Sequence, residues 1–308
     1  MTSFLCYYTI IMQNIHIEHP EDSILTGDLT VLDWFTADSN ISVKIDGAPA
    51  IVWGTNPSTG NFFVGTKSVF NKVKIKINES HQQIDKNHTG EVADILHNCF
   101  DYLPRIDGIY QGDFIGFGGN HTYCPNTITY KFPEIVYQRL LIAPHTKYIA
   151  HKDLRDCIAF PITYKVENTP HVRFVQPKVE LSVHLDDIEQ ACKFARQMST
   201  MVEFVNDRQA AELKKAINTY VKEGYELDEE ELAEDYQVDI NLLRLWKLVE
   251  SIKMDMFCYI FTNYDITCEI NSKDVDHEGY VMDNDYGTYK IVDRYTFSYH
   301  NFNCGKFN

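Results

Sequence analysis

The chain has 308 residues, of which 44% are hydrophobic and 23% charged, a composition that is ordinary for a soluble globular protein with a full core. Its net charge of −16 argues against a protein that coats nucleic acid non-specifically, although a basic groove on an acidic body is compatible with it. The eight cysteines are scattered without a Cys-x-x-Cys pair, which argues against a zinc module or a disulfide framework and is typical of reduced thiols in a cytoplasm.

Residues 1–40 are predicted to form an N-terminal extension. Residues 4–12 are apolar, but the run is short and has no cationic start, so it favours a strand or an extension over a signal peptide. No stretch approaches the ~20 consecutive apolar residues that cross a bilayer. The sequence therefore predicts a cytoplasmic protein without a membrane partner.

The next segment predicts a strand that carries a lysine and a carboxylate together. Val43 and Ile45 alternate with Lys44 and Asp46, which places Lys44 and Asp46 on one face. Gly47 follows, at a point where a side chain would obstruct the approach of a ligand. A lysine fixed in this way is able to act as a covalent nucleophile once its amine is deprotonated.

Downstream, the pattern predicts a hairpin of strands 51–53 and 62–66 and then an amphipathic helix over 89–103 that Thr89 caps. Between them, lysines alternate with apolar residues over 72–77, so three ammonium groups share one face of a predicted strand. Such a strand is compatible with an edge that lysine protects from aggregation and with a track for a phosphate backbone. The sequence does not choose between these two interpretations.

Helical periodicity begins at about residue 185 and continues to 262, which predicts a helical insertion. Within it, seven of the ten residues 226–235 are acidic. A solvated helix face is the favoured interpretation of this run, and a docking surface for a protein partner is the alternative. Strand character then resumes.

Five short motifs occur along the chain in a fixed order: Lys44-Ile45-Asp46-Gly47, Tyr110–Gly116 around Asp113, Thr127–Phe132, Glu278–Met282 and Tyr289–Asp293. In this order they resemble motifs I, III, IIIa, IV and V of the covalent nucleotidyltransferases, the superfamily of ATP-dependent DNA ligases, RNA ligases and mRNA capping enzymes. Several segments also resemble ligase-like proteins of tailed phages, which would place the chain in the cytoplasm of an infected bacterium.

The resemblance implies an α+β fold of the ligase-type nucleotidyltransferase (ATP-grasp-like) kind, with antiparallel sheets around a nucleotide cleft. It also implies that Lys44 attacks the α-phosphorus of ATP, expels pyrophosphate and holds AMP covalently. In polynucleotide ligases the AMP then passes to a 5′-phosphate, from which a 3′-hydroxyl displaces it. Lys44 must be neutral to attack, and neighbouring cations, burial or a metal would lower its pKa from the ordinary value of about 10.4.

The resemblance assigns roles to ten residues. The catalytic set is Lys44, Asp46, which orients the nucleophile, and Lys290, which neutralises the transferred phosphate. Glu278 is expected to bind Mg²⁺ or Mn²⁺. The nucleotide-binding set is Gly47, Lys67, Asp113 at the ribose, Tyr130, Phe132 and Arg294.

Three features depart from the pattern of the superfamily. Residues 48–50 are Ala-Pro-Ala where many ligases carry an arginine, and Lys67 is the candidate substitute. The fifth motif has one lysine, Lys290, and Arg294 would supply a second cation on the same face if the strand stays regular. Tyr130 and Phe132 compete for the role of stacking on the base.

We therefore expect a nucleotidyltransferase domain over 41–184 and 263–308, a helical insertion over 185–262 and no C-terminal oligonucleotide-binding (OB) barrel. The leading function is an ATP-dependent polynucleotide ligase, with RNA ends favoured over nicked DNA as its substrate. One alternative is a nucleotidyltransferase with a protein or small-molecule acceptor. Another is a nucleotide-binding or partner-binding protein on a ligase scaffold.

Overall fold

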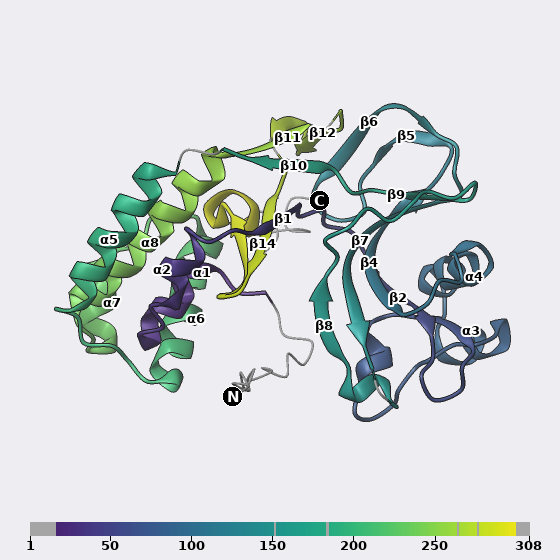
Figure 1. Ribbon diagram of the computed structural model, residues 1–308, viewed down its shortest axis with the longest axis horizontal. Coiled ribbons are helices and arrows are strands. Elements are labelled where there is room, and N and C mark those ends of the chain that lie inside the picture. Colours follow the sequence, from purple (N-terminus) through teal and green to yellow (C-terminus); the bar gives the residue numbers. More distant parts are fainter. Residues whose placement is uncertain (1–16, 151, 183–184, 264, 276, 300–308) are drawn as a thin grey trace, which may run out of the picture. The chain divides into compact units, whose positions relative to one another are not determined.

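The computed structural model describes residues 17–150, 152–182, 185–263, 265–275 and 277–299 (Figure 1). The predicted apolar run at 4–12 lies outside these residues. The described chain forms two compact units, and the sequence passes between them several times. Of the described residues, unit 1 comprises 47–119 and 137–175, and unit 2 comprises 17–46, 120–136 and those from 176 onward.

Unit 1 contains an antiparallel sheet with the strand order β3-β2-β4-β7-β8, and β9 pairs with β7 in parallel. Its strands are β2 (Ala50–Thr55), β3 (Phe62–Gly65), β4 (Ile109–Phe117), β7 (Leu140–Ile149), β8 (Ile158–Pro161) and β9 (Val172–Phe174). Its helices are α3 (His81–Asn87), α4 (Glu91–Tyr102) and the short 3₁₀ helices η2 (Lys67–Phe70) and η3 (Leu154–Asp156).

Both faces of this sheet are covered, which explains why its central strands are rich in apolar residues. On one face, Leu96 and Cys99 of α4 join a buried cluster with Trp53 of β2. On the other face, Val52 of β2 and Tyr148 of β7 pack with residues of η2 and η3. The hairpin of β2 and β3 forms as the sequence predicts.

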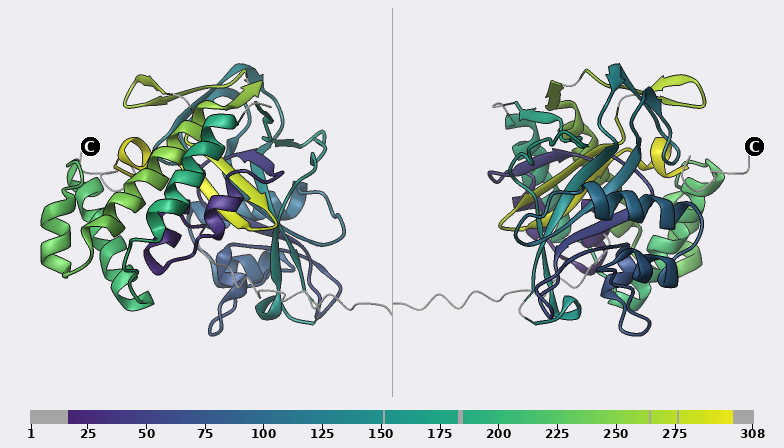
Figure 2. Two further views of the ribbon diagram at one scale, coloured as in Figure 1. Left: turned by 60° about the vertical axis from the view of Figure 1, so that its left-hand side comes forward. Right: turned by 90° about the vertical axis from the view of Figure 1, so that its right-hand side faces the viewer.

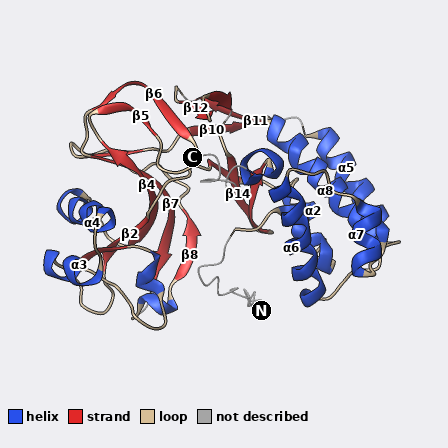
Figure 3. Ribbon diagram, turned by 180° about the vertical axis from the view of Figure 1, so that it is seen from behind, coloured by secondary structure: helices blue, strands red, loops and turns tan. Residues whose placement is uncertain are grey.

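Unit 2 combines three small antiparallel sheets with a group of helices (Figure 3). The sheets have the orders β1-β14-β15, β10-β11 and β13-β12-β6-β5. The strands are β1 (Asn40–Val43), β5 (Asn120–Tyr123), β6 (Thr129–Val136), β10 (Lys178–Leu181), β11 (Ile260–Asn263), β12 (Thr267–Ile270), β13 (Lys273–Val275), β14 (Gly279–Asn284) and β15 (Gly287–Val292). The helices are α1 (Pro20–Ser23), η1 (Ile24–Thr26), α2 (Thr30–Trp34), α5 (Asp186–Ser199), α6 (Asp207–Glu223), α7 (Glu229–Tyr236), α8 (Ile240–Cys258) and the π-helix η4 (Arg294–Ser298).

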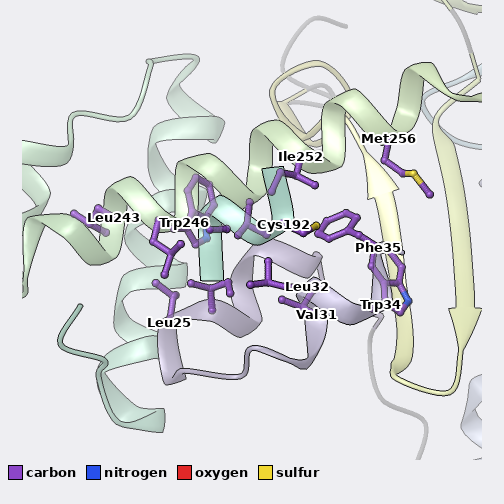
Figure 4. Close-up of a cluster of buried hydrophobic side chains, with 14 of the residues drawn as sticks. Leu25, Val31, Leu32, Trp34, Phe35, Cys192, Leu243, Trp246, Ile252 and Met256 are labelled. Atoms are coloured by element: carbon purple, nitrogen blue, oxygen red, sulfur yellow. The ribbon is translucent and has the colours of Figure 1, made fainter. Parts of the chain in front are cut away.

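Helix α8 is the centre of unit 2. It contacts α1, α5, α7 and strand β15, and Figure 2 shows the yellow hairpin of β14 and β15 beside the green helices. Figure 4 shows Trp246, Ile252 and Met256 of α8 facing Leu32 and Trp34 of α2 in one buried cluster. Residues 17–40, predicted as an extension, are thus part of the hydrophobic core. Their apolar side chains pack with buried residues that lie between Ile188 and Ile291 in the sequence.

Two local predictions are wrong. Residues 72–77, which all lie in the described chain, form no strand, and Lys74 adopts a left-handed conformation with φ of 58° that interrupts an extended segment. Helix α4 begins at Glu91 with Gly90 as its N-cap, so Thr89 does not cap it. The acidic run, by contrast, does form a helix, because the Asp228 side chain accepts hydrogen bonds from the N–H groups of Glu230 and Glu231 at the start of α7.

The structure is a mixed α/β fold of mainly antiparallel sheets, as the sequence predicts, and no sheet of the described residues closes into a barrel. The predicted helices of 185–262 correspond to α5, α6, α7 and α8. The predicted domain boundaries differ from the two compact units, because strand pairing joins segments that are distant in sequence. The ligase-type fold stays a prediction.

Candidate active site

The three-stranded sheet of unit 2 has one apolar and one polar face. Residues that pair in register across β1, β14 and β15 form rows, and all members of a row lie on the same face of the sheet. Successive rows lie on opposite faces. The row Val43, Tyr280 and Ile291 packs into the helical core. The next row, Ser42, Val281 and Lys290, therefore lies on the opposite face. This polar face is the platform on which the predicted residues of motifs I, IV and V meet.

Lys44 lies at the end of β1 and is tied to the start of β14. Its backbone N–H donates to the carbonyl oxygen of Gly279 at 2.8 Å, although the strand itself ends at Val43. Its ammonium Nζ lies 2.5 Å from Oε1 of Glu278 and 4.0 Å from Oδ1 of Asp46. The Lys44 side chain is 27% exposed, whereas that of Glu278 is 4% exposed. The nucleophile candidate is thus accessible, and its carboxylate partner is not.

Burial shapes the chemistry of Glu278. Its removal from water raises the pKa of the carboxyl group above the ordinary value, and the charge of Lys44 opposes that rise. Oε2 of the same carboxyl is buried and has no hydrogen-bond partner among the described residues. A buried carboxylate oxygen without a partner is unfavourable unless something else binds it.

Asp46 is held in place by two groups from the segment that leads into and along β6. Its backbone N–H donates to the hydroxyl oxygen of Tyr130 at 2.8 Å, and the Asn126 side-chain amide donates to its Oδ2 at 2.6 Å. Tyr130 is 2% exposed, and burial together with the nearby Glu278 raises the pKa of its phenol. Asn126 was not predicted, although its place in a turn just before the Thr127–Phe132 motif is a signal that points to it.

Lys290 shares the polar face with Lys44. Its pKa is lowered from 10.5 to about 8, first by burial and then by the positive charges of Lys44 and Arg294. Its backbone N–H donates to the carbonyl oxygen of Glu18 at 3.1 Å, which fixes β15 against the chain that precedes α1. Lysines with such a lowered pKa occur more often at functional sites than on ordinary solvent-exposed surfaces.

Gly279 begins the central strand β14 and pairs with Val292 of β15. Its φ is +146°, and a Cβ atom there would lie 2.2 Å from the carbonyl oxygen of Ile291. A side chain at this position is therefore excluded both by conformation and by contact. The absence of a side chain allows the backbones of β14 and β15 to approach closely beside the residues that carry the two lysines.

Arg294 is not a residue of the sheet, because β15 ends at Val292 and η4 begins at Arg294, and its guanidinium lies in a buried ionic network. Its Nη2 contacts Oδ2 of Asp22 at 3.0 Å and its Nε contacts Oε1 of Glu21 at 3.3 Å. Lys253 of α8 contacts the same Glu21 oxygen at 2.7 Å. The prediction that Arg294 follows Lys290 on one face required β15 to continue as a regular strand. In the described chain β15 ends at Val292, so Arg294 does not share that face as a strand residue. Glu21, Asp22 and Lys253 were not predicted, because nothing in their local sequence marks them as partners.

The remaining predicted residue of unit 2 is Phe132, which follows Tyr130 by two positions on β6. It is 6% exposed, and its ring packs edge-on against Tyr123 with centroids 5.5 Å apart. Both aromatic side chains are therefore enclosed by protein. The stacking role stays a prediction for either one.

Three predicted residues belong to unit 1. Gly47 packs against β4, where a Cβ atom would lie 2.5 Å from the carbonyl oxygen of Phe114. Asp113 lies on β4 with its Oδ1 3.8 Å from Nε2 of His145. Lys67 is the first residue of η2 and lines a surface cavity. Their roles toward a nucleotide stay predictions.

The described residues contain no group of three or more His, Cys, Asp or Glu side chains arranged to hold a metal ion. Magnesium, however, is commonly held by one or two carboxylates together with the phosphates of a substrate. The partnerless Oε2 of Glu278, with Asp46 near the same ammonium, fits that donor set.

Across the described chain, the helices are too short or too polar to span a membrane. Comparisons with curated proteins and with solved structures found no match. A protein family matches the sequence over residues 14–237 and 226–306. Since these two segments together span most of the sequence, the chain belongs to that family, the Family of unknown function (DUF6267).

Proposed function

We propose that the chain is a covalent nucleotidyltransferase in which Lys44 attacks the α-phosphorus of ATP. The observation that carries this proposal is the polar face of the β1-β14-β15 sheet. On it, an accessible lysine amine lies 2.5 Å from a buried carboxylate, and a second, partly buried lysine has a pKa of about 8. All of these groups belong to unit 2, so the proposal uses only residues within one compact unit.

The reaction begins with an ammonium that must lose a proton. Glu278 Oε1 is within hydrogen-bond distance of Lys44 Nζ, and its raised pKa favours acceptance of that proton. The neutral amine then forms a bond to the α-phosphorus, and the bond from that phosphorus to the pyrophosphate oxygen breaks. The products are a lysyl-AMP phosphoramidate and pyrophosphate.

Lys290 and Asp46 support this step. Positive charge on Lys290 stabilises the charge that develops on the phosphate, and such electrostatic positioning provides most of the catalysis in phosphoryl transfer. Asp46, fixed by Tyr130 and Asn126, limits the positions that the Lys44 ammonium occupies. Glu278 Oε2 and Asp46 would hold Mg²⁺ or Mn²⁺, which when bound neutralises phosphate charge.

The proposed acceptor is the end of a polynucleotide, with RNA favoured over DNA. Support comes from the ordered motifs and from the way charge divides between the two units. Unit 1 carries twelve Lys and Arg against ten Asp and Glu, whereas unit 2 carries sixteen against thirty-four. Unit 1 thus escapes the strong negative charge that would repel a phosphate backbone.

A protein or small-molecule acceptor is the second candidate. The acidity of unit 2, which carries the proposed nucleophile, favours it. The lysines of 72–77 also fail to form the continuous basic strand that a phosphate track requires. The acidic helix α7 would then provide a surface for a basic protein partner.

The deciding experiment is incubation with α-labelled ATP and Mg²⁺, followed by a denaturing gel. We expect label on the wild type and none on Lys44→Ala or on Lys44→Arg, which retains the charge but is not a nucleophile. Lys178→Ala, which removes an exposed lysine of the same unit, is the matched control and should label normally. Glu278→Gln should label slowly, because the variant lacks the carboxylate at 2.5 Å that takes the proton, and Asp46 lies 4.0 Å from the amine.

An unlabelled wild type, whose intact mass shows that it carries no AMP beforehand, would refute the proposal and favour a binding protein. A labelled wild type is next mixed with 5′-phosphorylated RNA or nicked DNA. Loss of label to either nucleic acid supports the ligase, and retention of label favours the second candidate.

A further inference from the structure

A surface cavity of about 400 Å³ lies in unit 1, at η2 and η3. Pockets of roughly 300 to 1,000 Å³ accommodate small-molecule ligands. Three cationic residues line this cavity: Lys67 of η2, Lys72 just after η2 and Arg155 of η3. The chain as a whole has a net charge of −16, whereas the charged residues that line this cavity are all cationic.

The cations of the cavity are available to a ligand. Lys67 and Lys72 are exposed, and neither makes an ion pair within the described residues. Arg155 is paired with Asp153, but that contact uses the Nε and Nη2 edge of the guanidinium. Asp153 caps η3 through the backbone N–H of Arg155, so the pair also fixes the position of the arginine.

The other lining groups match a phosphate attached to a flat ring. Two polar residues, Asn71 and Ser68, also line the cavity, and the Ser68 hydroxyl lies 2.8 Å from the Thr66 hydroxyl. Phe70 also lines the cavity, and its ring contacts that of Tyr148 with centroids 4.6 Å apart. An aromatic ring beside a cluster of cations is the combination that stacks a base and binds its phosphate.

We propose that this cavity binds a phosphate monoester, carried either by a mononucleotide or by the 5′ end of an oligonucleotide. A monoester carries nearly two negative charges at neutral pH, against one for a backbone diester. Three cationic residues at one cavity, only one of them paired with a carboxylate, therefore favour the monoester. The inference does not depend on the chemistry of Lys44, because every residue in it belongs to unit 1.

Fluorescence anisotropy with a short, 3′-labelled single-stranded RNA tests the proposal, with the 5′-phosphorylated strand compared with its 5′-hydroxyl counterpart. The protein is the full chain with Lys44→Ala, so that no covalent transfer affects binding. We expect the phosphorylated strand to bind about tenfold more tightly. Lys72→Glu should abolish that preference, and Arg155→Ala should reduce both the preference and the dependence of affinity on salt.

Lys74→Glu is the matched control, because it reverses the same charge two residues away but outside the cavity. Unlabelled AMP competes fully if the ligand is a mononucleotide and poorly if it is a strand end. Equal binding of the two strands, or equal losses for Lys72→Glu and Lys74→Glu, would overturn the proposal. Should Lys72→Glu fail to fold, Lys72→Gln serves in its place. Labelling of Lys44 by ATP is a separate measurement, so either proposal can fail while the other stands.

Discussion

Replacing Lys290 by methionine should stabilise the protein while removing a charge that the proposed transfer of AMP needs. The two side chains have similar length and volume, so the change mainly deletes the ammonium. In the folded chain that ammonium is unfavourable, because burial and the charges of Lys44 and Arg294 lower its pKa from 10.5 to about 8. A methionine on the polar face has no charge to desolvate.

The magnitude follows from the two pKa values. At pH 7 lysine is protonated in both the folded and the unfolded chain, and the difference between 10.5 and about 8 corresponds to about 3 kcal/mol of lost stability. Partial exposure of the side chain reduces this to about 2 kcal/mol. Between pH 8 and 10.5 the unfolded chain binds one more proton than the folded chain, so the stability of the wild type rises with pH. At about pH 9.5 the advantage of Lys290→Met should fall to about 1 kcal/mol.

Urea unfolding of wild type and variant at both pH values measures these differences as shifts of the midpoint. Lys273→Met, which removes an exposed lysine of strand β13, is the control and should change stability by less than about 0.5 kcal/mol. Lys290→Met should also lose labelling by ATP, and its higher stability excludes unfolding as the reason. A destabilised variant, or an advantage that does not shrink at alkaline pH, would refute the account of Lys290.

Two further substitutions test the surroundings of the site. Lys253→Met should destabilise the protein by about 3 kcal/mol in urea unfolding, because it leaves the buried Glu21 carboxylate without its 2.7 Å partner. Adding Glu21→Gln should recover part of that loss, and a fully additive double variant would contradict the reasoning. Gly279→Ala should lower the melting temperature far more than Gly60→Ala, because both glycines have positive φ but a Cβ atom at Gly60 meets nothing within 4 Å. Equal shifts for the two glycine variants would show that the close contact has no energetic effect.

The elements with strong local signals could be predicted from the sequence. The helices α5, α6, α7 and α8 have apolar positions at helical spacing, and β2 and β3 are apolar runs on either side of a turn-rich loop. The meeting of Lys44, Glu278 and Lys290 could also be predicted, but from the order of motifs rather than from periodicity. Antiparallel pairing of β1 with β14 and of β14 with β15 then brings the three residues together.

The network around Arg294 could not be predicted, because ion pairs between distant segments leave no local pattern. Glu21 and Asp22 precede their partners by more than 230 residues, and acids near a helix start are usually solvated. The strand predicted over 72–77 was wrong for the opposite reason, because here a local pattern was present but did not correspond to the structure. The alternation of lysines with apolar residues imitates a strand, yet Lys76 Nζ bonds instead to the carbonyl oxygen of Asn87, and the backbone turns at Lys74. Alternation predicts a strand only where a neighbouring strand is present to pair with it.

The two cations of β15 and η4 differ in how their surroundings treat their charge, and this difference bears on the proposed function of the polar face. Burial acts to lower the pKa of the Arg294 guanidinium, but the charges of Glu21 and Asp22 outweigh it, so the pKa is raised and the group stays charged. Lys290, four residues earlier, is affected in the opposite direction, since the charges of Lys44 and Arg294 lower its pKa. A chain selected for stability alone would place an apolar residue at such a position. The unfavourable lysine instead pairs with Val281 and shares a face with Lys44, and in the proposed function the phosphate of the nucleotide would relieve the repulsion between the two ammonium groups.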